Sequence, residues 1–214
     1  MVHKLNWLTL FLAILLTALP SCTPPDFDAQ QEEGVVLEEG VRVQIDALQN
    51  FSPVESERTD RAALVLEAAL NSDEFRRGVL DFTWNGKQTF ANNNGLTNEQ
   101  IYAVIMAGRE TYSDDDDHVA NLSLSLYSPP FFKRWGVVGY GYPGTPQIYI
   151  NRNYFKVMSM ASLVGLLAHE WCHKLGFDHD YRRTAKRPYS VPYGIGSLVT
   201  EIADSLPNME RTRS

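Results

Sequence analysis

Three of the chain's five histidines fall within one short segment, 169–179, whose spacing restricts what the chain can fold into. His169 and His173 are four residues apart, so on an α-helix they lie on one face, about one turn apart, and can reach one ion. Gly176 follows within a turn, where a helix can end on a left-handed residue because glycine has no Cβ to clash. This reversal would return His179 to the same point. The segment therefore predicts a helix, a sharp turn and a cluster of three imidazoles.

A zinc ion with three nitrogen ligands keeps a fourth position open for water, which is typical of catalytic sites. We therefore expect His169, His173 and His179 to bind Zn²⁺. Glu170 projects from nearly the same side of the helix, so it is better placed to act as general base on a metal-bound water than to bind the metal. The alternative is a buried histidine cluster without metal, which three histidines at ligand spacing around a glutamate disfavour.

The residues before the histidines also favour a helix. No proline intervenes between Ser159 and Leu175, and apolar residues recur at helical spacing. This stripe predicts a face buried in the core. Trp171 and Cys172 are expected to be packing residues and not catalytic ones.

The N-terminal residues are typical of a bacterial export signal. Lys4 supplies a short positive region, and the apolar run 8–19 is too short for a comfortable membrane span. The run ends in Leu19-Pro20-Ser21-Cys22, which resembles the lipobox of bacterial lipoproteins. The resemblance implies that residues 1–21 are removed and that Cys22 anchors an exported protein to a membrane, at the periplasmic face of the outer membrane or at the cell surface. The alternative is an ordinary cleaved signal with an incidental cysteine.

Composition limits the remaining chain. Residues 22–40 are polar and acidic, as in a flexible tether, and residues 41–214 suit one domain with a sizeable core. The net charge of −7 provides no basic surface for nucleic acid. With Cys22 lipidated, no intramolecular disulfide can form, and the thiol of Cys172 should be buried. We expect a monomer.

Hydrophobic periodicity predicts strands interleaved with helices, and so an α/β or α+β domain built on one mixed sheet. Asn85-Gly86 is a strong turn signal, and the segment 135–144 is rich in glycine and aromatic residues. Strands are expected at 41–45, 121–127 and 147–151, and helices at 60–80 (with a break at Asn71-Ser72) and at 98–108 (behind a Thr97/Gln100 capping box).

Leucine alternates with serine in the expected strand 121–127. Such alternation indicates a half-buried strand, with the leucines facing the core and Ser123 and Ser125 facing solvent. The acidic run Asp114–Asp117 could suggest oxygen ligands for calcium, but it lacks the spacing of a known calcium motif, so a solvated loop is the preferred interpretation. His118 receives no role.

The string from His169 to His179 resembles the signature of metzincin-type zinc metallopeptidases, and the specific resemblance covers about residues 145–200. It implies a mixed twisted sheet over the active-site helix, with a small C-terminal subdomain. It also implies an edge strand, antiparallel to bound substrate, at the rim of the cleft. By order along the chain, Ile148–Asn151 is the candidate for this strand, and an ordinary internal strand is an equal alternative. An edge strand could bind extended peptides main chain to main chain.

The chain departs from this family in lacking the methionine of the turn beneath the zinc, since no methionine lies between His179 and Asn208. At the expected distance, Ser190–Gly196 has the proline and glycine content of a tight turn. The resemblance implies that Tyr193 could bind zinc or stabilise the oxyanion, with a packed turn tyrosine equally plausible.

Two further expectations concern residues near this departure. The resemblance implies that Asp180 orients the site through hydrogen bonds. A C-terminal helix is expected over Ser197–Leu206, before Pro207.

These expectations combine into a zinc-dependent endopeptidase in which Glu170 assists the attack of a zinc-bound water on a peptide bond. Its partners would be protein or peptide substrates. One alternative is a catalytically silent zinc-binding or adhesive surface domain, against which the presence of Glu170 counts. Another is a zinc hydrolase that acts on a non-peptide amide.

Overall fold

The computed structural model describes residues 40–112, 116–130, 136–142 and 144–206. The expected export signal 1–21, Cys22 and nearly all of the tether lie outside the described residues. Within the described ranges, none of the helices has both the length and the apolar character that a bilayer span requires.

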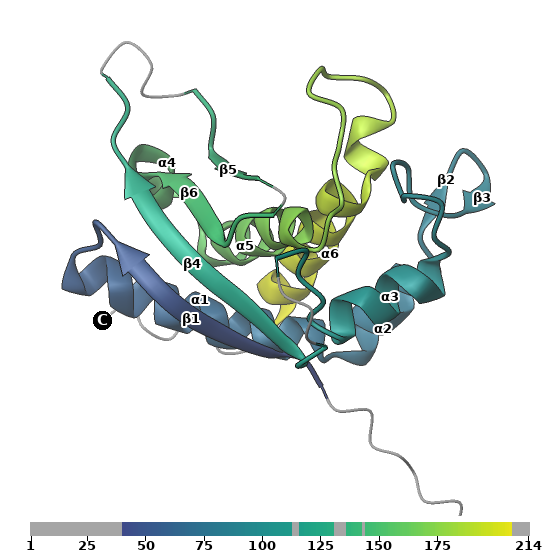
Figure 1. The fold of residues 1–214 in the computed structure, drawn as a ribbon, viewed down its shortest axis with the longest axis horizontal. Helices are drawn as coiled ribbons and strands as arrows, with labels where there is room; N and C mark the ends of the chain where they lie inside the picture. The colour runs from purple at the N-terminus through teal and green to yellow at the C-terminus, as the bar shows by residue number, and fades with distance from the viewer. Residues whose placement is uncertain (1–39, 113–115, 131–135, 143, 207–214) are drawn as a thin grey trace, which may run out of the picture. The chain divides into compact units, whose positions relative to one another are not determined.

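A mixed sheet forms one layer of the domain, with the strand order β1-β4-β6-β5 (Figure 1). Strands β1, β4 and β6 run parallel to one another, and β5 is antiparallel to β6. The strands span Arg42–Gln49 (β1), Val119–Tyr127 (β4), Gly139–Gly141 (β5) and Gln147–Asn151 (β6). The expected mixed α/β architecture is therefore confirmed.

The structure decides between the two alternatives for Ile148–Asn151, and the expectation of an edge strand is wrong. β6 lies between β4 and β5, so Ile148–Asn151 is internal, and β5 stands at the end of the sheet order. The glycine-rich segment folds back to form β5 beside β6. Its glycines let the strand pass very close to the helix beneath it. A Cβ at Gly139 would lie only 3.0 Å from Oε1 of Glu170.

The leucines of β4 face the core as predicted, and Leu122 and Leu124 are fully buried. Ser125 is buried too, with 5% of its surface exposed, which contradicts the expectation that it faces solvent. Because β4 is flanked by β1 and β6, its polar side is covered more than the alternation alone suggests.

The N-terminal helices match the predicted break but not the predicted start. Helix α1 begins earlier, at Pro53, behind a capping box of Ser52 and Glu55. The Asn71 side chain accepts a hydrogen bond from the backbone N–H of Val41 and donates one to its carbonyl, which ties the break to the start of β1. The two helices span Pro53–Leu70 (α1) and Asp73–Leu80 (α2).

The small hairpin and the next helix confirm their sequence signals. The hairpin turns at Asn85-Gly86, where both residues have positive φ (52° and 74°). Helix α3 begins behind the predicted capping box of Thr97 and Gln100. These elements span Thr83–Trp84 (β2), Lys87–Gln88 (β3) and Asn98–Met106 (α3).

The central helix α5 packs its apolar face into the same core as the inner leucines and isoleucines of the sheet. It begins behind the N-cap Ser159, and Trp171 and Cys172 are fully buried, as expected of packing residues. The indole Nε1 of Trp171 donates to Oε1 of buried Glu110 at 2.8 Å. The remaining helices span Arg152–Val157 (α4), Met160–Lys174 (α5), Arg187–Tyr189 (η2, a 3-10 helix) and Val191–Ser205 (α6).

The tight turn expected at Ser190–Gly196 is wrong. Ser190 caps α6, and the residues after it are already helical, so the C-terminal helix begins six residues before Ser197. Pro192 fits because proline is tolerated in the first turn of a helix. The glycines bring α6 against α5, since a Cβ at Gly165 would lie 2.6 Å from the carbonyl oxygen of Gly196. Helix packing, not turn formation, explains this composition.

Candidate metal centre

Helix α5 ends in the left-handed reversal that the sequence predicts. Gly176 has a φ of 87°, and its N–H donates to the carbonyl of His173 at 3.2 Å. The N–H of Phe177 donates to the carbonyl of Cys172 at 3.1 Å, which completes a Schellman motif. Because Phe177 is buried, the chain is anchored as it turns back along the helix.

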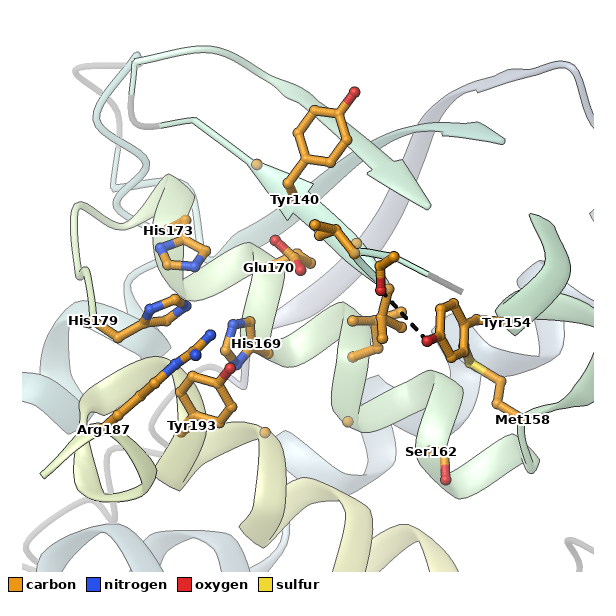
Figure 2. A pocket seen from close by; sticks show the side chains of 18 of the residues that line it. Tyr140, Tyr154, Met158, Ser162, His169, Glu170, His173, His179, Arg187 and Tyr193 are labelled. Atoms are coloured by element: carbon orange, nitrogen blue, oxygen red, sulfur yellow. Dashed lines mark hydrogen bonds between the residues drawn. The ribbon is translucent and has the colours of Figure 1, made fainter. Parts of the chain in front are cut away.

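The reversal brings the three predicted histidines together. One ligand atom from each of His169, His173 and His179 lies within 4.8 Å of the others, and among the described residues this is the group that could hold a metal ion. Figure 2 shows the three rings converging on one side of the pocket. The structure is therefore compatible with a metal at this point, without specifying which metal.

Backbone carbonyls orient the rings. Nδ1 of His173 lies 2.8 Å from the carbonyl oxygen of Phe177. Nδ1 of His179 lies 3.2 Å from that of Asp180, and His169 has a backbone partner in the first turn of α6. A carbonyl only accepts, so the Nδ1 atoms of His173 and His179 carry hydrogen and their Nε2 lone pairs are available to an ion.

The histidines are held in the neutral form that a metal needs. Burial lowers the pKa of His169 to about 3. Burial also lowers the pKa of His173 and of His179. Neutral imidazoles at physiological pH bind a cation without first losing a proton.

Glu170 lies beside the histidines, beneath β5 (Figure 2). Only 3% of the surface of Glu170 is exposed to solvent. Burial raises its pKa to about 7, against the opposing charge of Lys174. Its Oε2 atom is buried and has no hydrogen-bond partner among the described residues. A carboxylate in this state can both accept and release a proton near neutral pH.

Lys174 is a residue of this site that sequence reasoning missed. It is fully buried, and its Nζ donates to the carbonyls of Tyr142, Thr145 and Gln147 at 3.2, 2.5 and 2.8 Å. Burial lowers its pKa to about 8, while Glu170 opposes the shift. The ammonium therefore ties the β5–β6 connection to α5. A single lysine in a helix carries no local signal of such a role.

Tyr193 reaches the site from the first turns of α6. Its ring centroid lies 4.5 Å from that of His169 and 4.8 Å from that of His179. Tyr193 thus lies beside the histidine cluster, although a helix positions it and not a tight turn. The guanidinium carbon of Arg187, which the sequence did not single out, lies 4.8 Å from the Tyr193 ring centroid.

Asp180 does not orient the site in the expected way. Its carboxylate accepts a hydrogen bond from Thr184 at 2.5 Å, which lowers its pKa, and pairs with Lys186 at 3.3 Å. It also contacts Asn92 at 3.4 Å. The contact with His179 comes from the backbone carbonyl, so the carboxylate holds the following loop instead.

The acidic run is only partly described, since residues 113–115 lie outside the described ranges. Asp116 pairs with Arg109, and Asp117 accepts a backbone N–H two residues further on at 2.9 Å. Nδ1 of His118 lies 2.8 Å from the carbonyl oxygen of Met106. Among the described residues, the group that could hold a metal ion does not include Asp116, Asp117 or His118.

A cleft of about 1600 Å³ runs over the histidines, lined by β5 above and by α5 and α6 below. Comparison with protein-family models, with curated proteins and with solved structures yields no match. The domain is thus defined by its own geometry, as a mixed α/β fold that carries three clustered histidines beside a buried glutamate.

Proposed function

We propose that this protein is a zinc-dependent endopeptidase similar to the metzincins. The observation that carries the proposal is the position of Glu170. It is a buried carboxyl with a pKa of about 7, and its Oε2 has no hydrogen-bond partner among the described residues; it lies next to three clustered neutral histidines. A purely structural metal site has no use for such a group.

The donor set fits zinc. Zinc accepts three histidine nitrogens at about 2.0–2.1 Å and leaves a fourth position open. His169, His173 and His179 would hold it, with the backbone carbonyls described above fixing ring orientation. When bound, zinc lowers the pKa of water and polarises a peptide carbonyl.

The chain's own residues would manage the proton and the developing charge. Glu170 takes a proton from the attacking water, because its pKa lies close to neutral, and passes it to the leaving amine. The phenol of Tyr193, whose ring lies beside two of the histidines, would donate a hydrogen bond to the negative charge that develops on the carbonyl oxygen.

The cleft favours a polymeric substrate. At about 1600 Å³ it exceeds the range of roughly 300–1,000 Å³ usual for small-molecule sites. Strand β5 stands at the end of the sheet order and lines the cleft, so its outer edge is available to pair with an extended peptide. This pairing uses main-chain groups and tolerates many side chains.

The proposed setting comes from the sequence of residues 1–22, which indicates export and a lipid anchor at Cys22. The enzyme would then act on proteins or peptides outside the cytoplasm. Mass spectrometry of the intact protein, purified from a membrane fraction of an expressing bacterium, would detect the lipid as added mass on a chain that begins at Cys22.

The central experiment compares the wild-type domain with Glu170→Gln, measuring bound zinc and casein cleavage on the same preparations. The proposal expects equal zinc content and a loss of cleavage of at least about 100-fold in the variant. Wild-type protein that holds zinc and yet cleaves no protein or peptide would favour a silent binding domain. Cleavage of peptidoglycan in place of peptides would favour the hydrolase of non-peptide amides.

A further inference from the structure

Arg187 lies at the wall of the cleft, in the short helix η2 between the third histidine and α6. Its guanidinium carbon lies over the ring of Tyr193, and that ring contacts both His169 and His179. Figure 2 shows the guanidinium directed past Tyr193 toward these two histidines. A permanent positive charge is therefore held beside the place where a substrate bond would be cut.

Arg187 forms no ion pair among the residues that the structure describes. Its buried Nε also has no hydrogen-bond partner within that part of the chain. The one hydrogen bond from its Nη1, to the carbonyl of Tyr181, is long at 3.5 Å. Its neighbour Lys186, by contrast, pairs with Asp180. A guanidinium offers five N–H donors in a planar fork, and since Nε is buried, the terminal Nη groups of Arg187 are the donors left for a ligand.

We infer that Arg187 is a specificity-determining residue that binds a carboxylate of the substrate next to the bond to be cut. The inference rests on the proposed peptidase function. Arginine and a carboxylate form paired, charge-assisted hydrogen bonds, which are stronger than neutral ones. Stacking on Tyr193 holds the guanidinium in one orientation, so less side-chain freedom is lost on binding. Arg183, which lines the same cleft, adds to the positive potential.

The carboxylate could come from an acidic side chain or from the C-terminus of a peptide. Two pairs of peptides separate these sources. In one pair the residue beside the cleaved bond is Glu or Gln, with both ends blocked. In the other pair a neutral peptide ends in a free carboxylate or in an amide. The pair in which the acid is preferred identifies the source.

The test measures kcat/KM for these peptides with wild type, Arg187→Gln, Arg187→Lys and the control Arg182→Gln. Arg182 is exposed on the same segment and does not line the cleft. We expect wild type and the control to prefer one acidic peptide by about 10-fold, the value of one hydrogen bond to a charged group. Arg187→Gln should lose the preference, and Arg187→Lys should keep part of it because one cation remains.

Two outcomes overturn the inference and leave the peptidase intact. These are equal cleavage of all four peptides by wild type, and an acidic preference that persists in Arg187→Gln. If no peptide is cleaved, calorimetric binding of the same peptides decides. Tighter binding of an acidic peptide that is lost in Arg187→Gln supports the carboxylate site although the proposed function has failed. Equal binding overturns both. Zinc content and thermal unfolding of each variant control for folding.

Discussion

Lys174 and Glu170 lie one turn apart on α5, both buried, and each charge offsets the effect of burial on the pKa of the other. Lys174 also holds the β5–β6 connection through three carbonyls. Glu170 and the strand that covers it are thus supported by one ammonium group. This arrangement makes the geometry of the cleft sensitive to a residue that lies outside it.

Replacing Lys174 by Met should therefore destabilise the domain. The change leaves three carbonyl oxygens without their donor in a buried place, at a cost of about 2–4 kcal/mol. Urea unfolding measures the effect. Lys87→Met, at an exposed position in the hairpin, is the matched control and should change stability by less than about 0.5 kcal/mol. Equal effects of the two substitutions would contradict the role assigned to Lys174.

Gly165→Ala tests the contact between α5 and α6. In an exposed helix this change stabilises by about 1 kcal/mol. Here the new Cβ would lie 1.8 Å from Oγ1 of Thr200 and 2.6 Å from the carbonyl oxygen of Gly196, so we expect a loss of about 1–3 kcal/mol.

Thr200→Ala should not restore stability to the Gly165→Ala variant, because the backbone clash remains. Gly78→Ala in α2 is the control, since only the flexible end of Leu198 must move there. Thermal unfolding of the four proteins checks the order. A stabilised Gly165→Ala would show that the helices do not pack as described.

Zinc should stabilise the protein through the histidine cluster. A ligand that binds only the folded state adds about 4 kcal/mol at a concentration 1,000 times its Kd. Adding zinc to chelator-treated wild type should therefore raise Tm, and His179→Ala should lose most of this gain. His118→Asn should keep it, because His118 contacts the backbone of Met106 and lies outside the cluster. A gain that survives in His179→Ala would place the metal elsewhere.

The histidine cluster should make the metal-free protein sensitive to acid once the opposing carboxyl of Glu170 is removed. Burial lowers the pKa of His169 to about 3, whereas in an unfolded chain histidine titrates near about 6.5. Between these values the unfolded state binds more protons, so stability falls as the pH falls. In wild type this loss is offset by Glu170, whose raised pKa of about 7 makes the folded state bind more protons over the same range. In Glu170→Gln, which lacks this opposing group, we expect a loss of about 1–2 kcal/mol from about pH 6.5 to pH 5. Urea unfolding of Glu170→Gln after chelation measures it, and a flat profile in that variant would be inconsistent with the lowered pKa of His169.

Sequence reasoning predicted the features whose geometry is set within a few residues. The four-residue spacing of His169 and His173, the reversal at Gly176 and the turn at Asn85-Gly86 each depend on local backbone conformation. The structure confirms all three. Local rules suffice here because helix pitch and glycine's freedom at positive φ are the same in any protein.

Other features depended on partners far along the chain. Proline and glycine at 190–196 suit a turn or a closely packed helix start, and only the contact of Gly196 with Gly165 decides between them. The edge position of β5 follows from the pairing of a segment without hydrophobic periodicity. No local sequence pattern predicts the role of Lys174, because its hydrogen-bond partners lie in the loop that follows β5.

The sequence by itself determined the spacing of the three histidines, the glutamate beside them and the reversal that gathers the imidazoles. Tertiary structure decided what surrounds them: the strand above Glu170, the helix that presents Tyr193, and the guanidinium of Arg187 over the ring of Tyr193. The physical reason is the distance along the chain over which each kind of interaction acts. Backbone sterics and helix pitch act over a single turn, whereas burial, pairing and charge depend on whichever distant segments the fold brings together.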